Sequence, residues 1–127
     1  MLTQTTAQAI AQTWIESWNR HDLDEIMSHY AEAIEFSSPF IVQLIGEPSG
    51  TLKDKAALRA YFAKGLAAYP DLQFELLHTL TGVNSLVLYY RSVRNNLAAE
   101  LMVLNAAGQI VQVMAHYCPE PDQPAGA

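Results

Sequence analysis

Apolar residues recur at intervals of three and four in three parts of the chain, and this spacing predicts three helices. The first helix is expected at 6–19, with Thr5 as its N-terminal capping residue. A second, short helix is expected after Asp22, and a third runs from Asp54 to about Ala67, because aspartate is a favoured N-cap. The apolar face of the first helix carries Ile10, Trp14 and Trp18.

The C-terminal half of the chain is instead divided into apolar runs separated by turn residues, which is typical of strands. The four strands are predicted at 72–80, 85–94, 97–104 and 109–118. A shorter strand is expected earlier, at 33–37. The apolar segment 40–45 that follows fits either a strand or a lid. Asn95 and Asn96 predict a tight hairpin, because asparagine tolerates positive φ.

The expected order of elements is therefore α-α-β-α-β-β-β-β, which defines the α+β class. We expect a curved antiparallel β-sheet wrapped around the three helices, in one domain at 1–118. The segment 119–127 is rich in proline and glycine and is expected to be a flexible tail.

Both faces of the strand at 97–104 are apolar, which predicts that helices cover one face and a second subunit covers the other. A homodimer is therefore expected through the outer face of the sheet. The outer stripe consists of Val87, Tyr89, Val93, Leu101, Val103 and Met114.

The composition narrows the class of protein. The chain has 127 residues, half of them hydrophobic and 16% charged, which excludes a disordered protein. No apolar run approaches the ~20 residues of a membrane span, and we expect no membrane association. The net charge of −6 argues against nucleic-acid binding, which needs a basic surface. Cys118 is the only cysteine, and the N-terminus lacks the basic start of a signal peptide, so a cytoplasmic protein is expected.

Glu100 is the residue most suited to chemistry. Every other residue from 97 to 104 is apolar, so its carboxyl is expected to be buried, neutral and raised in pKa. A neutral carboxylic acid can donate a hydrogen bond to a carbonyl or enolate oxygen. The alternative is a structural carboxylate paired with Arg91 or Arg94.

Other kinds of site have weaker signals. The four histidines show no spacing typical of metal ligands, and there is no glycine-rich phosphate loop. We therefore expect no metal and no cofactor. His78 is the only histidine that we consider for a pocket.

Several short motifs, taken in order, resemble the nuclear transport factor 2-like superfamily, which includes ketosteroid isomerase and the SnoaL-like polyketide cyclases. They are Trp14–Asn19, His21–Ile26, Tyr30–Glu32 and Phe36–Pro39, followed by Tyr61, Phe62, Gly65 and a closing hairpin from Glu100 to Tyr117. The resemblance covers 6–118. It implies a cone-shaped, cystatin-like fold whose pocket opens at the wide end, and a dimer through the outer sheet face.

The resemblance also implies positions for the site. The first-helix position of the ketosteroid isomerase pocket falls on Trp14, its base on Ser38 and its third-strand acid on Glu100. Of these three positions, only Glu100 keeps a group that can gain or lose a proton at useful pH. The indole N–H of Trp14 does not exchange its proton in that range, and Ser38 without a partner is no base. The expected ligand-binding residues are Trp14, Trp18, Tyr30, Ser38, Phe62, Leu88, Tyr90, Val113, Ala115 and Tyr117.

Three functions fit these features. The first is a cofactor-independent isomerase, cyclase or dehydratase that acts on a hydrophobic carbonyl compound, with Glu100 as acid or polar anchor. The second is a binding module with the same apolar pocket and no turnover. The third is a protein-interaction domain, like the transport factor itself, since one fold can host all three.

Overall fold

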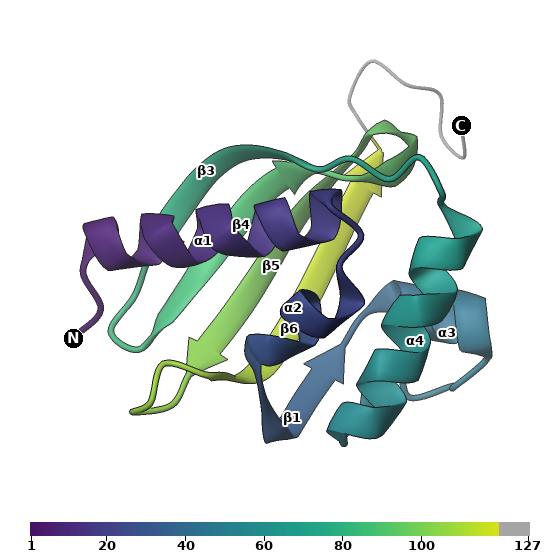
Figure 1. Ribbon diagram of the computed structural model, residues 1–127, viewed down its shortest axis with the longest axis horizontal. Coiled ribbons are helices and arrows are strands. Elements are labelled where there is room, and N and C mark those ends of the chain that lie inside the picture. Colours follow the sequence, from purple (N-terminus) through teal and green to yellow (C-terminus); the bar gives the residue numbers. More distant parts are fainter. Residues whose placement is uncertain (120–127) are drawn as a thin grey trace.

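A computed structural model describes residues 1–119 and confirms the α+β class (Figure 1). The helices are α1 (Gln4–Asn19), α2 (Leu23–Ser28), α3 (Pro39–Ile45) and α4 (Lys55–Ala68). The strands are β1 (Tyr30–Ser37), β2 (Thr51–Leu52), β3 (Glu75–Thr81), β4 (Ser85–Arg91), β5 (Asn96–Leu104) and β6 (Ile110–Pro119). Within these residues, no helix is long and apolar enough to cross a membrane.

The six strands form one curved, unclosed sheet in the order β2-β1-β6-β5-β4-β3. Neighbouring strands are antiparallel except β1 and β6, which run parallel. The helices lie on one side of the sheet, with α1 along β3 and β4 and with α2 and α4 beside β1 (Figure 1). The long strands therefore wrap around a core that the helices close.

Two of the three predicted N-terminal capping residues are confirmed. Asp22 and Asp54 accept hydrogen bonds from Glu25 N and Ala57 N, at 3.2 and 2.7 Å, and so cap α2 and α4 as predicted. The first helix begins earlier than expected, because Thr3 rather than Thr5 accepts from a backbone N–H. Both threonines suit a cap, and the sequence alone did not separate them.

The segment at 40–45 is neither strand nor lid but the helix α3. Its side chains are apolar without a clear period, and such a run does not distinguish a short helix from a strand. The flanking residues decide it: Ser38 caps the helix, Pro39 occupies its first turn, and Gly46 ends it with a left-handed φ of 73°. The helix leaves Ile41 fully buried.

Other boundaries differ from the prediction by a few residues. The strand β1 begins at Tyr30, three residues early, while β3 begins three residues late and β4 ends at Arg91. The strand β6 includes Pro119, so the predicted tail is one residue shorter at its start. The rest of that tail, 120–127, lies outside the described residues.

The tight hairpin between β4 and β5 turns one residue earlier than predicted. Arg94 and Asn95 are its two central residues, both with positive φ, at 56° and 59°. Ser92 N donates to Asn96 O at 2.7 Å and closes the turn. Three residues, Val93–Asn95, therefore lie between these two hydrogen-bonded residues, and left-handed backbone at two successive residues is the geometry of a type I′ turn.

The inward face of the sheet follows the predicted alternation. Glu100 stands opposite Leu88 on β4 and Ala115 on β6, and the next inward row joins Tyr90, Ala98 and Tyr117. All of these residues are buried except Tyr117, which is partly buried. The sheet therefore carries Glu100 toward the helices.

Candidate functional site

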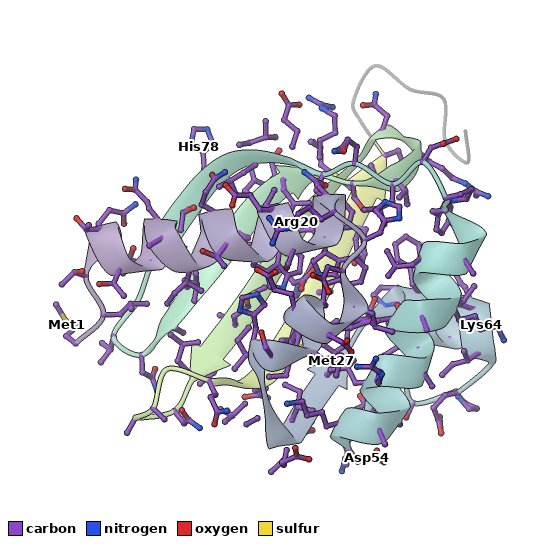
Figure 2. All side chains as sticks on the ribbon, viewed as in Figure 1. Met1, Arg20, Met27, Asp54, Lys64 and His78 are labelled. Atoms are coloured by element: carbon purple, nitrogen blue, oxygen red, sulfur yellow. The ribbon has the colours of Figure 1, made fainter. Side chains whose placement is uncertain are left out.

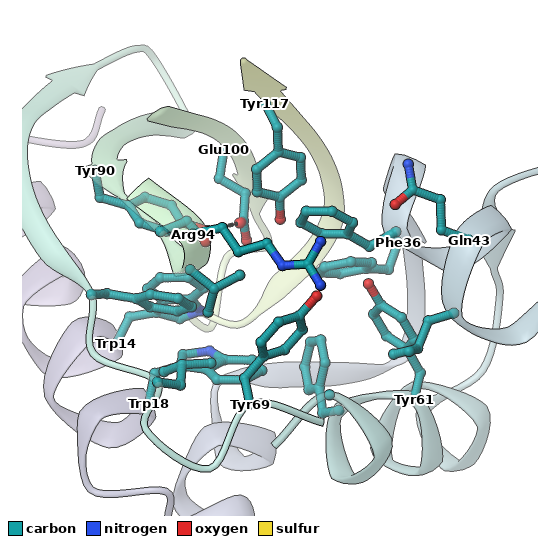
Figure 3. Close-up of a pocket in the computed structure, with 18 residues that line it drawn as sticks. Trp14, Trp18, Phe36, Gln43, Tyr61, Tyr69, Tyr90, Arg94, Glu100 and Tyr117 are labelled. Atoms are coloured by element: carbon teal, nitrogen blue, oxygen red, sulfur yellow. Dashed lines mark hydrogen bonds between the residues drawn. The ribbon is translucent and has the colours of Figure 1, made fainter. Parts of the chain in front are cut away.

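A cavity of about 270 Å³ lies between the inner face of the sheet and the helices α1, α3 and α4 (Figure 3). Its walls are largely aromatic. The aromatic lining residues are Trp14, Trp18, Phe36, Phe40, Tyr61, Phe62, Tyr69, Phe74, Tyr90 and Tyr117. An apolar cavity with few polar groups is the usual form of a small-molecule site.

Glu100 is the one carboxylate that lines the cavity in the described part of the chain. It comes from β5 and is 2% exposed. Tyr90 Oη donates a hydrogen bond of 2.6 Å to Glu100 Oε1 (Figure 3). Glu100 Oε2 is buried without a hydrogen-bond partner among residues 1–119. The carboxyl therefore retains an unused hydrogen-bonding position at the cavity wall.

Burial raises the pKa of Glu100 from 4.5 to about 7, although the hydrogen bond from Tyr90 opposes the rise. A buried carboxyl loses the hydration that stabilises its charge, and no cation compensates it here. Both protonation states of Glu100 are therefore populated near neutral pH. The predicted alternative of an arginine partner is not what the structure shows, because within residues 1–119 neither Arg91 nor Arg94 forms an ion pair with Glu100.

Phenol groups surround this carboxyl. Burial raises the pKa of Tyr61 to about 12, and it also raises the pKa values of Tyr30, Tyr90 and Tyr117. The charge of Glu100 contributes in the same direction for all four. These phenols therefore stay protonated at neutral pH and serve as hydrogen-bond donors.

The two tryptophans of α1 form one wall. Trp14 stacks on Phe74 with ring centroids 5.8 Å apart, and Trp18 meets Phe62 edge-on at 4.8 Å. Trp14 Nε1 donates to Tyr30 Oη at 2.9 Å. The indole N–H of Trp18 is buried and has no acceptor among residues 1–119. It is a second unused polar group at the cavity wall.

The predicted site residues divide into two groups. Those that line the cavity are Trp14, Trp18, Phe62, Tyr90, Glu100 and Tyr117. Those that lie behind the lining are Tyr30, Ser38, Leu88, Val113 and Ala115, all of them buried. Tyr30 binds Trp14, and Ser38 Oγ accepts from Phe40 N at 3.2 Å as the cap of α3.

Three parts of the lining were not predicted. Tyr61 and Gly65 lie on α4 and Tyr69 is its C-terminal capping residue, at intervals of four along the stripe that also carries Phe62. That helical spacing was the signal that could have placed them. The residues of α3 and of the Arg94 turn carried no such signal, because 40–45 fitted either a strand or a lid and Arg94 was expected to end the strand at 85–94.

No metal site accompanies the cavity in the described residues: no three His, Cys, Asp or Glu side chains within 1–119 gather as metal ligands. His78 lies on β3 and stacks against Tyr89, with centroids 6.3 Å apart, and does not line the cavity. Proton transfer and hydrogen bonding are thus the chemistry that the lining side chains themselves offer.

A bent sheet around helices, with an aromatic cavity between them, defines the class of nuclear transport factor 2-like folds. Within that class the chain belongs to the SnoaL-like domain family, whose model matches residues 11–117. Among proteins with curated descriptions, none matches the chain.

Solved structures agree with this assignment. A SnoaL-like protein of unknown function from Burkholderia thailandensis is 44% identical, with a TM-score of 0.88 over 93% of this chain and 99% of that chain. A SnoaL-like family protein from Agrobacterium tumefaciens, provisionally described as an isomerase, is 18% identical, with a TM-score of 0.73 over 91% and 99% of the two chains. AclR from Streptomyces galilaeus, provisionally described as a hydroxylase, is 18% identical, with a TM-score of 0.72 over 94% and 83%.

Proposed function

We propose that this protein is an enzyme of the isomerase, cyclase or dehydratase type that acts on an apolar carbonyl compound in the cavity. The observation that carries the proposal is the Glu100 carboxyl. It is buried at the cavity wall, with one oxygen bound by Tyr90 and the other unpartnered. A ligand oxygen placed beside Oε2 would supply the missing hydrogen-bond partner of the carboxyl. A polar group left unsatisfied at such a depth is otherwise costly.

The chemistry follows from the neutral form of Glu100. As an acid it would donate a hydrogen bond to the carbonyl oxygen of the ligand. That bond would strengthen as the oxygen gains negative charge, which happens when the neighbouring carbon gives its proton to a water molecule or a buffer base that enters the cavity. Tyr90 would hold the carboxyl in place through Oε1. Glu100 would then act as acid or polar anchor in the reaction.

A binding module without turnover is the second candidate, and one observation favours it. The resemblance puts a base at Ser38, but this hydroxyl is occupied as the cap of α3. The two distant structural neighbours, described provisionally as an isomerase and a hydroxylase, do not choose between these functions, because fold alone does not define an activity.

Proton exchange on a ketone distinguishes the two functions. With α-tetralone in D₂O, we expect the wild-type protein to speed deuterium uptake at the carbon next to the carbonyl, as followed by proton NMR. Glu100→Gln should lose about 10²-fold or more of this activity, because the amide cannot transfer its proton at useful pH. The same variant should still bind α-tetralone, since the amide retains a donor.

The controls separate binding from chemistry. Tetralin lacks the carbonyl and should bind the wild-type protein more weakly than α-tetralone, and Glu100→Leu should remove that difference. Binding without exchange above the buffer rate would support the binding module. Absence of binding by either compound would contradict both candidate functions.

The homodimer also remains a proposal. Val87 and Leu101 face each other on the outer side of the sheet, and Met114, beside Leu101, is 42% exposed. One predicted member of this stripe is wrong: Val93 lies in the β4–β5 turn and lines the cavity. The remaining residues form an apolar patch that a second copy of the chain could cover.

Sedimentation equilibrium at micromolar concentration should therefore give twice the chain mass. Val87→Lys should give the single-chain mass of 14.1 kDa, because each dimer would bury two unpaired charges. Ala107→Lys, in the exposed β5–β6 loop, adds the same charge and should leave the dimer intact. A monomeric wild-type protein would rule out the proposed interface.

A further inference from the structure

The cavity has a second charged residue, which the proposed function does not use. Glu100 and Arg94 are the two charged side chains among the described residues that line it. Glu100 is buried in the sheet, whereas Arg94 is exposed in the β4–β5 turn. The Arg94 side chain extends beside Tyr69, the C-terminal capping residue of α4, with the Arg94 Cζ atom 5.8 Å from the centre of the Tyr69 ring (Figure 3). The cavity therefore has a neutralisable acid deep inside and a permanent cation at its mouth.

Arg94 has no carboxylate partner within residues 1–119. Four of the chain's seven basic residues, Arg20, Lys55, Arg59 and Arg91, form ion pairs, and Arg94 is not among them. The chain as a whole carries a net charge of −6 and so repels anions. The guanidinium of Arg94, with no carboxylate partner within residues 1–119, therefore attracts anions locally at the cavity mouth.

The backbone supports a role for this side chain. Arg94 has a left-handed conformation, with φ 56° and ψ 27°, at the first central position of the turn formed by residues 93–96. Asparagine and glycine adopt this conformation far more readily than arginine does. The turn thus holds a residue that its own geometry disfavours, and strain of this kind is common at functional sites.

We propose that Arg94 selects ligands that carry a carboxylate at the end opposite the carbonyl group, so that the substrate is a hydrophobic keto acid. A guanidinium binds a carboxylate through two parallel hydrogen bonds, which fixes the orientation of the ligand as well as its charge. The apolar body would lie against the tryptophan wall. This inference rests on the proposed function, because it assigns the carbonyl end to Glu100.

A matched pair of ligands tests the inference by isothermal titration calorimetry. The probes are para-acetylbenzoic acid and its methyl ester, which share the ketone and the ring and differ in charge. The wild-type protein should bind the acid about tenfold more tightly than the ester, as expected for one charge-assisted contact. The preference should shrink as salt rises, because Arg94 is exposed and its field is screened.

Arg94→Asn is the informative variant, because asparagine suits the left-handed turn and the protein should fold at least as well as the wild type. It should bind acid and ester equally. Lys64→Gln removes the same charge from an exposed side chain on the outer side of α4, which does not line the cavity, and should keep the preference for the acid (Figure 2). Glu100→Leu should weaken acid and ester alike.

The possible failures are distinguishable. Equal binding of acid and ester by the wild type, with both weakened by Glu100→Leu, would overturn the role of Arg94 and leave the proposed function standing. An acid preference that survives Arg94→Asn would overturn it as well. If neither compound bound the wild-type protein, the proposed function would fail, and this inference with it.

Discussion

Replacing Glu100 by glutamine should remove a pH-dependent loss of folding stability that the wild-type protein shows between pH 4 and pH 8. The pKa of Glu100 is about 7 in the folded protein, against 4.5 for an ordinary glutamate. Its ionised form is therefore less favourable in the folded state than in the unfolded state. A difference of this size corresponds to about 3 kcal/mol.

The sign of the effect follows from which state binds the proton more tightly. Below pH 4.5 the carboxyl is neutral in both states and costs no stability through ionisation. As pH rises, the unfolded chain ionises first, so stability falls until about pH 7 and then levels off. Glutamine does not ionise. Hence the free energy of unfolding of Glu100→Gln, minus that of the wild type, should increase by about 3 kcal/mol over this range.

Urea unfolding series at several pH values measure this difference directly. Glu35→Gln provides the control, because Glu35 is an exposed glutamate on β1 and its replacement should leave the pH dependence of the wild type unchanged. A variant that is less stable than the wild type at neutral pH, with a difference that disappears as the pH falls below 4.5, would show that Glu100 is an ionised, stabilising carboxylate. It would then be unsuited to act as an acid.

Substitutions at Gly65 should separate stability from ligand binding. Gly65 lies inside α4, on the stripe that lines the cavity, and a Cβ placed there meets nothing within 4 Å. Glycine costs a helix interior about 0.5–1 kcal/mol relative to alanine. Gly65→Ala should therefore stabilise the protein by about that amount, while leaving room for a ligand.

Gly65→Phe should behave differently, because its ring would occupy the cavity. We expect it to weaken binding of α-tetralone at least tenfold, in line with the cost of forcing extra groups into a filled space. Thermal unfolding of both variants, together with calorimetric titration, measures the two effects. Unchanged ligand affinity in Gly65→Phe would mean that ligands bind outside this cavity.

The sequence was enough to predict those parts of the fold that depend on residues close together in the chain. Asp22 and Asp54 were predicted as caps because a carboxylate that follows a polar segment and precedes an apolar stripe has one favourable position. The burial of Glu100 was predicted because every other residue from 97 to 104 is apolar. Each of these inferences needed only neighbours within a few residues.

The parts that the sequence did not predict depend on contacts between distant segments. Phe74, which precedes β3, lines the cavity because it packs against Trp14 and Trp18 of α1, and no local pattern records that contact. The helix α3 was missed because a short apolar run fits two kinds of element, and its flanking residues decide between them. The strained conformation of Arg94 is set by the hairpin register, which fixes which two residues turn.

The parallel pairing of β1 with β6 has a consequence for how the chain folds. Tyr30 is aligned with Ile110, and Ser37 with Met114, so strands from nearly opposite parts of the sequence must meet. Contacts between such distant residues form slowly, because a long loop must close first. During synthesis the early helices and β1 have only the two-residue β2 as a strand partner until β6 has left the ribosome. The strand β5, which carries Glu100, also has β6 as its neighbour, so the cavity is completed only when the last described strand takes its place.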